Sequence, residues 1–331
     1  MYGNIKNGGK TMPYSIEICA GAGGQALGLE AAGFEHTALV EIERPACDTL
    51  LYNRPKWDVI NGDIRYFSGV KYKGIDLLAG GVPCPPFSKA GKQLGQDDER
   101  DLFPEAIRLA DEIRPKAIML ENVRGMLDAV FDDYRKHLKN QLASLGYHTE
   151  WRLHNASDYG VSQLRPRVIF VALQKNITEY FSWPTPFKSL PPTVGELLFD
   201  LMKEKGWRGA ENWRKRADDI APTLVGGSKK HGGPDLGPTR SKKAWESLGV
   251  DGHGLADNPP EKDFFGMPRL TVRMAARIQG FPDSWRFAGK KTSAYRQIGN
   301  AFPPPVAQAV GASIMAALEA ASKRTILRSV K

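Results

Sequence analysis

Cysteine is scarce in this sequence, which has Cys19, Cys47 and Cys84 among 331 residues. An odd, sparse set without a Cys-x-x-Cys pair does not form a disulfide framework, and the six histidines show no metal-ligand spacing with the cysteines. We therefore expect no structural zinc and no resident metal. No run of 18 apolar residues occurs, and Met1–Lys10 lacks the apolar region of a signal peptide. These absences favour a cytoplasmic protein without a membrane span.

Positive charge is what the chain has in excess, with a formal net charge of +9 and a pI of about 9.3. Phe187–Lys291 contains 19 Lys and Arg and 13 Asp and Glu, a net of +6 in 105 of the 331 residues. A basic region of this kind favours a polyanionic partner such as nucleic acid, although many basic proteins bind none.

The first half of the chain alternates short apolar strands with helical patterns. Such alternation predicts an α/β protein with a doubly wound, mostly parallel sheet. The expected strands are 15–20, 37–42, a third ending near 63, 75–79, 117–120 and 168–173, and the expected helices are 24–32, 45–52, 102–113 and 134–145.

The pattern changes after residue 186, where Gly, Pro and charge increase and periodicity weakens. We expect two domains, a larger one from 1–186 plus 294–331 and a smaller, irregular one from 187–293. Within the smaller domain, Leu270, Met274 and Ile278 lie at helical spacing. The final apolar helix, Val306–Leu318, is expected to return and cover the first domain.

A glycine-rich turn, Ala20-Gly21-Ala22-Gly23-Gly24, follows the first strand and opens a helix. Such a turn lets the backbone approach a ligand at a strand's carboxyl end. Glu41 and Asp63 end the next two strands and can accept hydrogen bonds from ribose hydroxyls and an adenine amino group. Together they indicate an adenosine-type cofactor site; a plain tight turn and helix N-caps are the alternatives.

Cys84 lies in Pro83-Cys84-Pro85-Pro86-Phe87-Ser88, and Glu121 follows 37 residues later. Prolines fix φ and remove backbone donors, so this loop is stiff enough to aim a thiolate. A nearby carboxylic acid can protonate a ring nitrogen while the sulfur attacks the ring. The pair suits attack on an electron-poor heterocycle such as a pyrimidine.

Two further basic motifs flank this chemistry. The polar stretch Lys89–Arg100 could be a lid that brings Lys89 and Lys92 to a phosphate backbone, or an ordinary solvated loop. In Gln163-x-Arg165-x-Arg167, alternate residues of an extended chain point the same way. The arginines could grip a phosphate, orient Glu121 and a substrate carbonyl, or form a structural salt bridge.

Taken together and in this order, the motifs resemble the DNA (cytosine-5) methyltransferases, over nearly the whole chain outside 187–268. The matching elements are Ala20–Gly24, Glu41, Gly62-Asp63-Ile64, Pro83-Cys84, Glu121-Asn122-Val123, Gln163/Arg165/Arg167, Arg269–Trp285 and Gln297-Ile298-Gly299-Asn300. The resemblance implies a Rossmann-like methyltransferase domain with S-adenosyl-L-methionine as cofactor, and a target-recognition domain that reads double-stranded DNA.

The resemblance also implies a mechanism and site residues. Cys84 adds to C6 of a flipped-out cytosine, Glu121 bonds N3, and Arg165 and Arg167 hold the base and Glu121. The implied cofactor residues are Cys19, Ala20, Gly21, Gly23, Gly24, Glu41, Ile42, Asp63, Ile64, Leu102 and Asn300. The predicted DNA-binding residues are Ser88, Lys89, Lys92, Gln163 and Thr223, together with Lys229, Lys230, His231 and Arg240, which are chosen because they flank glycine pairs in the basic region.

Three residues depart from the family's usual pattern. Pro85 replaces a common Gln, which removes a side-chain hydrogen bond but keeps the loop stiff. Glu17 replaces a common Asp. Cys19 stands where many members have Phe, which puts stacking on the cofactor adenine in doubt.

The setting implied is a bacterial modification enzyme, solitary or paired with a cognate restriction endonuclease. An RNA cytosine-5 methyltransferase on the same scaffold is one alternative, and a non-catalytic DNA-binding regulator is another. A nicotinamide-dependent oxidoreductase is disfavoured, because the glycine-rich turn is not Gly-x-Gly-x-x-Gly.

Overall fold

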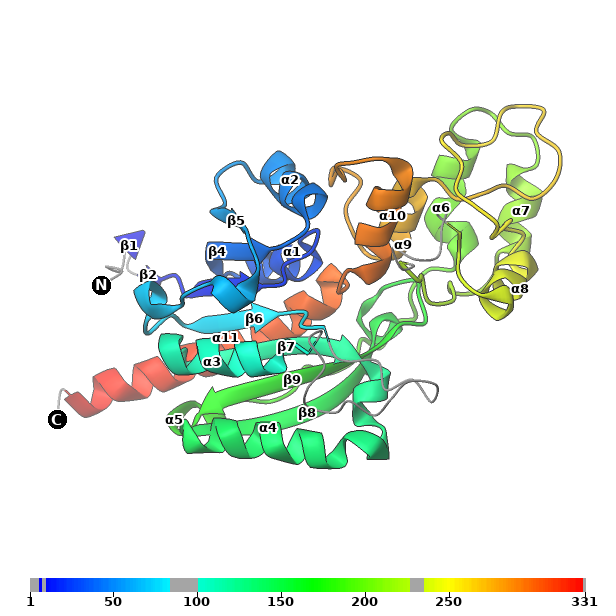
Figure 1. Cartoon of the computed structure of the whole chain (residues 1–331). Helices are drawn as coiled ribbons and strands as arrows, with labels where there is room; N and C mark the ends of the chain where they lie inside the picture. The colour runs from blue at the N-terminus through cyan, green and yellow to red at the C-terminus, as the bar shows by residue number, and fades with distance from the viewer. Residues whose placement is uncertain (1–5, 8–9, 84–100, 227–234, 330–331) are drawn as a thin grey trace.

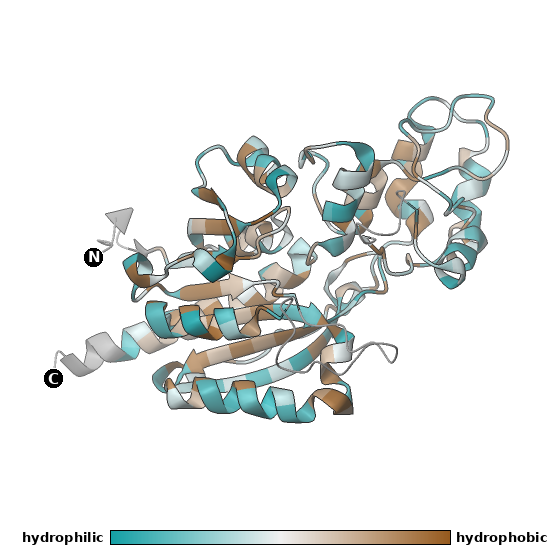
Figure 2. Ribbon diagram, in the orientation of Figure 1, coloured by the Kyte–Doolittle hydropathy of each residue, from teal (hydrophilic) through white to brown (hydrophobic). Residues whose placement is uncertain are grey.

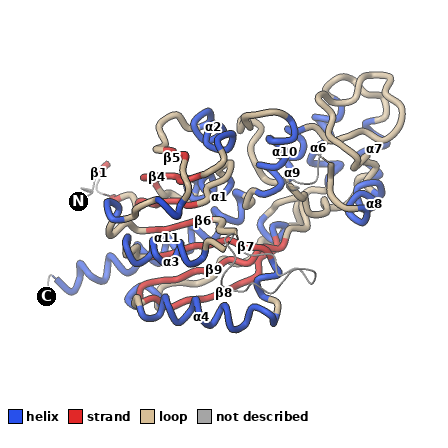
Figure 3. Tube along the Cα trace, in the orientation of Figure 1, coloured by secondary structure: helices blue, strands red, loops and turns tan. Residues whose placement is uncertain are grey.

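The computed structural model of the chain describes residues 6–7, 10–83, 101–226 and 235–329. Its strands gather in one part of the molecule, and a second part is built from helices and loops (Figures 1 and 3). The strands are β1 (Lys6–Asn7), β2 (Lys10–Thr11), β3 (Tyr14–Ile18), β4 (Glu35–Glu41), β5 (Val59–Asn61), β6 (Leu77–Gly80), β7 (Ala117–Val123), β8 (Tyr147–Asn155) and β9 (Pro166–Gln174).

The main sheet has seven strands in the order β5-β4-β3-β6-β7-β9-β8. The first five run parallel, whereas β9 is antiparallel to both β7 and β8. This confirms the expected α/β class with a mostly parallel sheet. The edge strand β8 was not among the expected strands, although apolar or β-branched residues alternate with polar ones along residues 147–153, a signal that the sequence analysis overlooked.

Helices cover both faces of this sheet. On one face, α3 (Phe103–Ile113) and α4 (Asp132–Ser144) bury Leu109, Leu138 and other apolar residues against β3, β6 and β7. On the other face, α1 (Gly24–Ala31) and α11 (Pro304–Ser329) pack together over Leu77 and Met119. Figure 2 shows brown strands between helices whose outer faces are teal. The sheet core is thus sealed on both sides.

Helix α11 returns to cover the sheet of the first expected domain, and it is longer than the predicted 306–318. The stretch Lys291–Arg324 is long and apolar enough for a membrane span, with a mean hydropathy of 1.3 in its most apolar window. However, 61% of that window is buried inside the protein. Packing against α1 and the sheet accounts for its composition.

The second part is more regular than the sequence suggested. It contains α6 (Val194–Lys203), α7 (Ala210–Arg216), α8 (Thr239–Ser247) and α9 (Val272–Ile278), and its described residues form no strand. The Thr193/Glu196 capping box opens α6, a signal that the sequence analysis overlooked. The expected helix around Leu270–Ile278 is α9, which Gly280 (φ 92°) ends.

The two parts share one apolar core. Leu198, Trp245 and Met274 belong to the same cluster as Ala20 and Leu50 of the sheet region. Helix α10 (Lys291–Asn300) runs through the expected domain boundary at residues 293 and 294. We call residues 187–293 the recognition lobe, after the role expected for them, and the rest the sheet lobe.

Candidate active site

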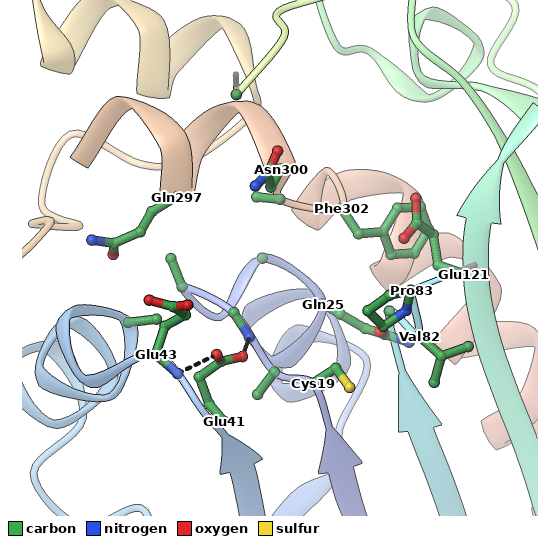
Figure 4. Close-up of a pocket in the computed structure, with 18 of the residues that line it drawn as sticks. Cys19, Gln25, Glu41, Glu43, Val82, Pro83, Glu121, Gln297, Asn300 and Phe302 are labelled. Carbon is green, nitrogen blue, oxygen red and sulfur yellow. Dashed lines mark hydrogen bonds between the residues drawn. The ribbon is translucent and has the colours of Figure 1, made fainter. Parts of the chain in front are cut away.

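A cavity of about 1030 Å³ opens at the carboxyl ends of β3, β4, β6 and β7. The strand ends form its floor, which carries Cys19, Glu41 and Glu121 (Figure 4). Its roof consists of the segment 223–226 and of α10, whose Gln297 and Asn300 line the cavity on the opposite side from the strand ends. The parallel strands therefore bring together residues that are far apart in the sequence.

The glycine-rich turn shapes one side of the floor. Gly21 and Gly23 adopt left-handed φ values of 54° and 85°, a region that favours glycine. A Cβ at Gly23 would lie 2.6 Å from Leu50 and 3.0 Å from Trp285. A Cβ at Gly21 would meet no described atom within 4 Å, because this backbone borders the open cavity. The turn therefore needs glycine for two reasons, conformation and close packing.

Glu41 is tied to this turn. Its carboxylate accepts hydrogen bonds from the backbone N–H groups of Gly21 and Glu43, each at 2.7 Å (Figure 4). Burial raises the pKa of Glu41, and these two bonds oppose that shift. Across the floor, Asp63 forms an ion pair with Arg65 at 2.6 Å, and hydrogen bonds from Arg65 lower the pKa of Asp63. Two carboxylates thus border the cavity at neighbouring strand ends.

The two departures at the end of β3 both line the cavity. Cys19 has a left-handed φ of 51°, unusual for a residue other than glycine, and burial raises the pKa of its thiol. Glu17 is buried, and its Oε2 has no hydrogen-bond partner among the described residues. Burial, followed by the charge of Glu41, raises the pKa of Glu17. A neutral thiol and an unsatisfied carboxyl therefore face the same space.

Glu121 and Arg167 form an ion pair at the cavity. The Arg167 Nε lies 2.6 Å from Glu121 Oε1, and the two side chains are 13% and 11% exposed, with Arg167 the more exposed. Burial raises the pKa of Glu121, and the charges of Arg167 and Arg165 oppose that shift. The neighbouring Asn122 donates to the Val82 carbonyl at 2.9 Å. This bond ties the end of β7 to the chain that leads to Cys84.

Cys84 and the predicted DNA contacts Ser88, Lys89 and Lys92 lie outside the described residues, as does Pro85. The chain is described again at Asp101, and Leu102 N–H donates to the Pro83 carbonyl at 3.3 Å. Pro83 and Leu102 both line the cavity. Described residues on both sides of the segment that carries Cys84 therefore lie at the cavity wall.

Gln163 and Arg165 do not lie where the sequence analysis expected them. Both side chains are fully buried at 0% exposure, and neither lines the cavity, although Arg167 does. A side chain with no accessible surface cannot contact DNA, so the DNA-binding assignment of Gln163 is corrected. Arg165 bonds backbone carbonyls behind the cavity instead of facing a substrate pocket.

The remaining predicted residues divide by position. Ala20, Gly24, Ile42, Ile64, Leu102, Asn300 and Thr223 line the cavity, whereas Gly23 supports the turn from behind. Arg240 is exposed on α8 in the recognition lobe. Lys229, Lys230 and His231 lie outside the described residues.

Several lining residues had not been predicted. Gln25, Val82, Arg296 and Phe302 border the cavity, and each lies within two residues of a named motif. Proximity to a motif was therefore the missed signal. Over the described ranges, no group of three His, Cys, Asp or Glu residues could hold a metal ion.

The sequence model of the family described as C-5 cytosine-specific DNA methylase matches residues 14–316 of this chain. Among curated proteins, type II methyltransferase M.NgoMIV of Neisseria gonorrhoeae is 64% identical over 308 residues, covering 92% of this chain and 98% of that protein. Type II methyltransferase M.NaeI of Lentzea aerocolonigenes is 58% identical over 309 residues, covering 92% and 75%. These matches confirm the resemblance inferred from the motifs.

Solved structures agree on the fold. A protein from E. coli, titled as a DNA modification methyltransferase encoded within a prophage, superposes with a TM-score of 0.66 at 24% identity, covering 93% of this chain and 99% of its own. A variant of Spodoptera frugiperda DNMT2 gives 0.63 at 18% identity, covering 92% and 99%.

Proposed function

The chain belongs to the C-5 cytosine-specific DNA methylase family and is a DNA (cytosine-5) methyltransferase, and from this premise we propose its cofactor, nucleophile and base-binding residues. The proposal is that the chain transfers a methyl group to C5 of a cytosine turned out of duplex DNA, with Cys84 as the nucleophile and S-adenosyl-L-methionine as the methyl donor that the cavity would hold. The observation that carries it is one cavity that joins the glycine-rich turn and Glu41 to Glu121, Arg167 and the end of the Cys84 segment.

The floor of the cavity fits this cofactor. Glu41 and Asp63 offer carboxylates for ribose hydroxyls and the adenine amino group, and the open backbone at Gly21 admits a ligand closely. The unpartnered Oε2 of Glu17 leaves an acceptor for a cationic group. Ala20, Gly24, Ile42, Ile64, Leu102 and Asn300 would complete the binding walls. When bound, this cofactor supplies an electrophilic methyl group.

The other end of the cavity suits a cytosine ring. The target base must leave the stack, because C5 and C6 cannot reach these groups inside a duplex. Glu121, whose pKa is raised by burial, holds a proton for N3 while the Cys84 thiolate forms a bond to C6. Electron density moves to C5, which takes the methyl group. Loss of the C5 proton then expels the thiolate and restores the ring.

Each remaining side chain has a narrower role in this scheme. Arg167 holds Glu121 and reaches the base at the cavity, whereas Arg165 acts from behind. Thr223, which lines the roof of the cavity, would lie beside the base. Ser88, Lys89 and Lys92 would approach the DNA from the Cys84 segment, and Lys229, Lys230, His231 and Arg240 from the recognition lobe.

The two lobes have different functions in this proposal. Residues 1–186 with 294–331 hold the cofactor and the chemistry, and residues 187–293, with a net charge of +6 over Phe187–Lys291, read the DNA. The type II relatives support a restriction-modification setting. In that setting the chain would act in the bacterial cytoplasm, solitary or alongside a cognate endonuclease. Because identity to M.NgoMIV reaches 64%, DNA methylated by this chain should accept few further methyl groups from M.NgoMIV.

The test is methyl transfer followed by site mapping. The purified chain is incubated with labelled S-adenosyl-L-methionine and either duplex DNA or transfer RNA, and modified cytosines are located by bisulfite sequencing. We expect label in duplex DNA at C5 of one sequence, and none from Cys84→Ser. Transfer to RNA alone would favour the RNA methyltransferase, and normal turnover by Cys84→Ser would overturn the proposed mechanism.

A further inference from the structure

Two amides and a guanidinium form a buried polar cluster between the lobes. Gln163 and Arg165 precede β9 in the sheet lobe, and Gln279 follows α9 in the recognition lobe. All three side chains are fully buried at 0% exposure, and none lines the cavity. We call these three residues the interlobe joint.

Hydrogen bonds link the two amides. Gln163 Nε2 donates to Gln279 Oε1 at 2.6 Å, and Gln163 Oε1 accepts from Leu224 N–H at 2.9 Å. Gln279 Nε2 in turn donates to the Ala301 carbonyl at 2.5 Å. One chain of bonds therefore runs from the sheet lobe through α9 to the end of α10.

The guanidinium closes the cluster. Arg165 donates to the carbonyls of Leu224 at 2.8 Å, Gly299 at 2.7 Å and Ala301 at 3.0 Å. It makes no ion pair within the described part of the chain, because Glu121 pairs with Arg167 instead. Burying a cation that is held by carbonyls alone costs free energy, and an apolar side chain would fill the same space at a lower cost. The position of the Arg165 hydrogen bonds is therefore the property to explain.

The joint fixes the roof of the cavity. Leu224 is held at its N–H by Gln163 and at its carbonyl by Arg165, and the Thr223 hydroxyl donates to the Leu164 carbonyl. Ala221 pairs with residues 162–164 in a short ladder. Thr223 lines the cavity, and Arg167, only two residues beyond Arg165, holds Glu121. A shift of the recognition lobe therefore moves Thr223 relative to Glu121.

We propose that the interlobe joint of Gln163, Arg165 and Gln279 positions the cavity roof over Glu121, so that the rate of methyl transfer depends on how the recognition lobe is seated on DNA. The inference rests on the proposed function. The three are positioning residues, because none touches the cavity. Correct DNA would seat the lobe and align Thr223 with Glu121, whereas a wrong base pair would leave them misaligned. Sequence discrimination would then appear in kcat as well as in binding.

The test uses near-isosteric substitutions that remove hydrogen bonds. Gln279→Met removes the bonds to Gln163 and Ala301, and Arg165→Lys keeps the charge but loses the three-way fork. Gln174→Met is the matched control, because Gln174 donates to the Pro115 carbonyl in the sheet lobe, away from the cavity. Each purified full-length variant is assayed on the duplex site mapped by bisulfite sequencing and on duplexes with one base pair changed.

We expect Gln279→Met to lower kcat on the mapped site and to reduce the kcat ratio between mapped and altered sites by about tenfold, the effect of roughly one buried polar interaction. Cofactor affinity, measured by calorimetry, should change less than twofold. A purely structural role would lower the folded fraction and leave that ratio unchanged. If Gln279→Met fails to fold, Arg165→Lys carries the same expectation.

The proposed role of the interlobe joint would be overturned if the kcat ratio between mapped and altered sites were unchanged in the folded variants. An equal change of that ratio in Gln174→Met would overturn it as well. Failure of the wild type to methylate any duplex would instead overturn the proposed function, so the two failures are distinguishable. Loss of cofactor binding in Gln279→Met would show that the joint supports the floor rather than the roof.

Discussion

The floor and the roof of the cavity are built in different ways. Floor residues bind near neighbours, as when Glu41 accepts from Gly21, 20 positions away. Roof segments are held by partners from the other lobe, as when Gln163 donates to Gln279, 116 positions away. In the proposed function the strand ends carry the chemistry, whereas its alignment with DNA depends on contacts between the lobes.

The largest effect should come from the floor, at Glu121. Glu121→Gln should lower the methylation rate by at least about 10²-fold, because an amide cannot transfer the proton to N3. Cofactor affinity should change little, since Glu121 pairs with Arg167 and not with the glycine-rich turn. Single-turnover kinetics and calorimetry measure the two quantities.

Glu150→Gln is the matched control, because Glu150 lies on β8 and bonds Trp183 outside the cavity. If Glu121→Gln abolished cofactor binding while the chemistry survived, Glu121 would belong to the cofactor site and its proposed role at N3 would be wrong.

A recognition-lobe residue should change specificity instead of rate. Arg240 is exposed on α8, and if its guanidinium reads a guanine edge, Arg240→Ala should cost about 1–3 kcal/mol of discrimination at one base pair. Binding to single-base variants of the mapped site measures this change. Arg208→Ala is the control, because Arg208 pairs with Asp263 at 2.8 Å in the same lobe. Equal changes in both variants, or in neither, would show that Arg240 does not read a base.

A smaller effect is expected at Glu41, on the cofactor side of the floor. Glu41→Gln should weaken cofactor binding by about tenfold, the size of a hydrogen bond to a charged group, while kcat at saturating cofactor changes little. Calorimetric titration with the cofactor measures the affinity. A large loss in kcat with unchanged affinity would mean that Glu41 belongs with Glu121 in the chemistry.

The smallest effect should appear outside both floor and roof. His154 is buried beside Tyr159, and burial, aided by the Arg152 charge, lowers its pKa from 6.5 to about 4. His154 becomes protonated below about pH 6.5 in the unfolded chain but only near pH 4 in the folded chain. The free energy of unfolding should therefore fall as pH drops from about 6.5 towards 4. Denaturant unfolding should show this slope flattened in His154→Gln, with the methylation rate per folded enzyme at pH 7.5 unaffected. An identical slope in both proteins would refute the assignment.

The same contrast explains what could be predicted from the sequence. Glu41, Asp63 and Glu121 could be placed because they end strands of a parallel sheet, and such ends meet at one edge. The burial of Gln163 and Arg165 could not be predicted, because it depends on Leu224, Gln279 and Ala301 arriving from other parts of the chain. An Arg-rich motif alone does not reveal whether its partner is a carboxylate, a phosphate or a carbonyl.

The recognition lobe was the least predictable part. Its helices α6, α7 and α8 are short and lie in a stretch rich in Gly, Pro and charge, so they were left unrecognised, although α6 has a capping box and an apolar face. The alternation of β8 was overlooked as well. By contrast, α9 follows clear apolar spacing and α11 is a long Ala-rich apolar stretch, and both were expected close to where they lie.

The central claim is that Cys84 attacks the base held by the Glu121 end of the cavity. The most direct measurement is mass spectrometry of the wild type after incubation with the cofactor and a duplex carrying 5-fluorocytosine at the mapped site. Fluorine at C5 blocks the final proton loss, so the covalent bond to C6 should persist. The account predicts a methylated nucleotide adduct on the peptide that contains Cys84, and none on Cys19 or Cys47. An adduct on Cys19, or methyl transfer to unmodified DNA with no adduct on the fluorinated duplex, would contradict it.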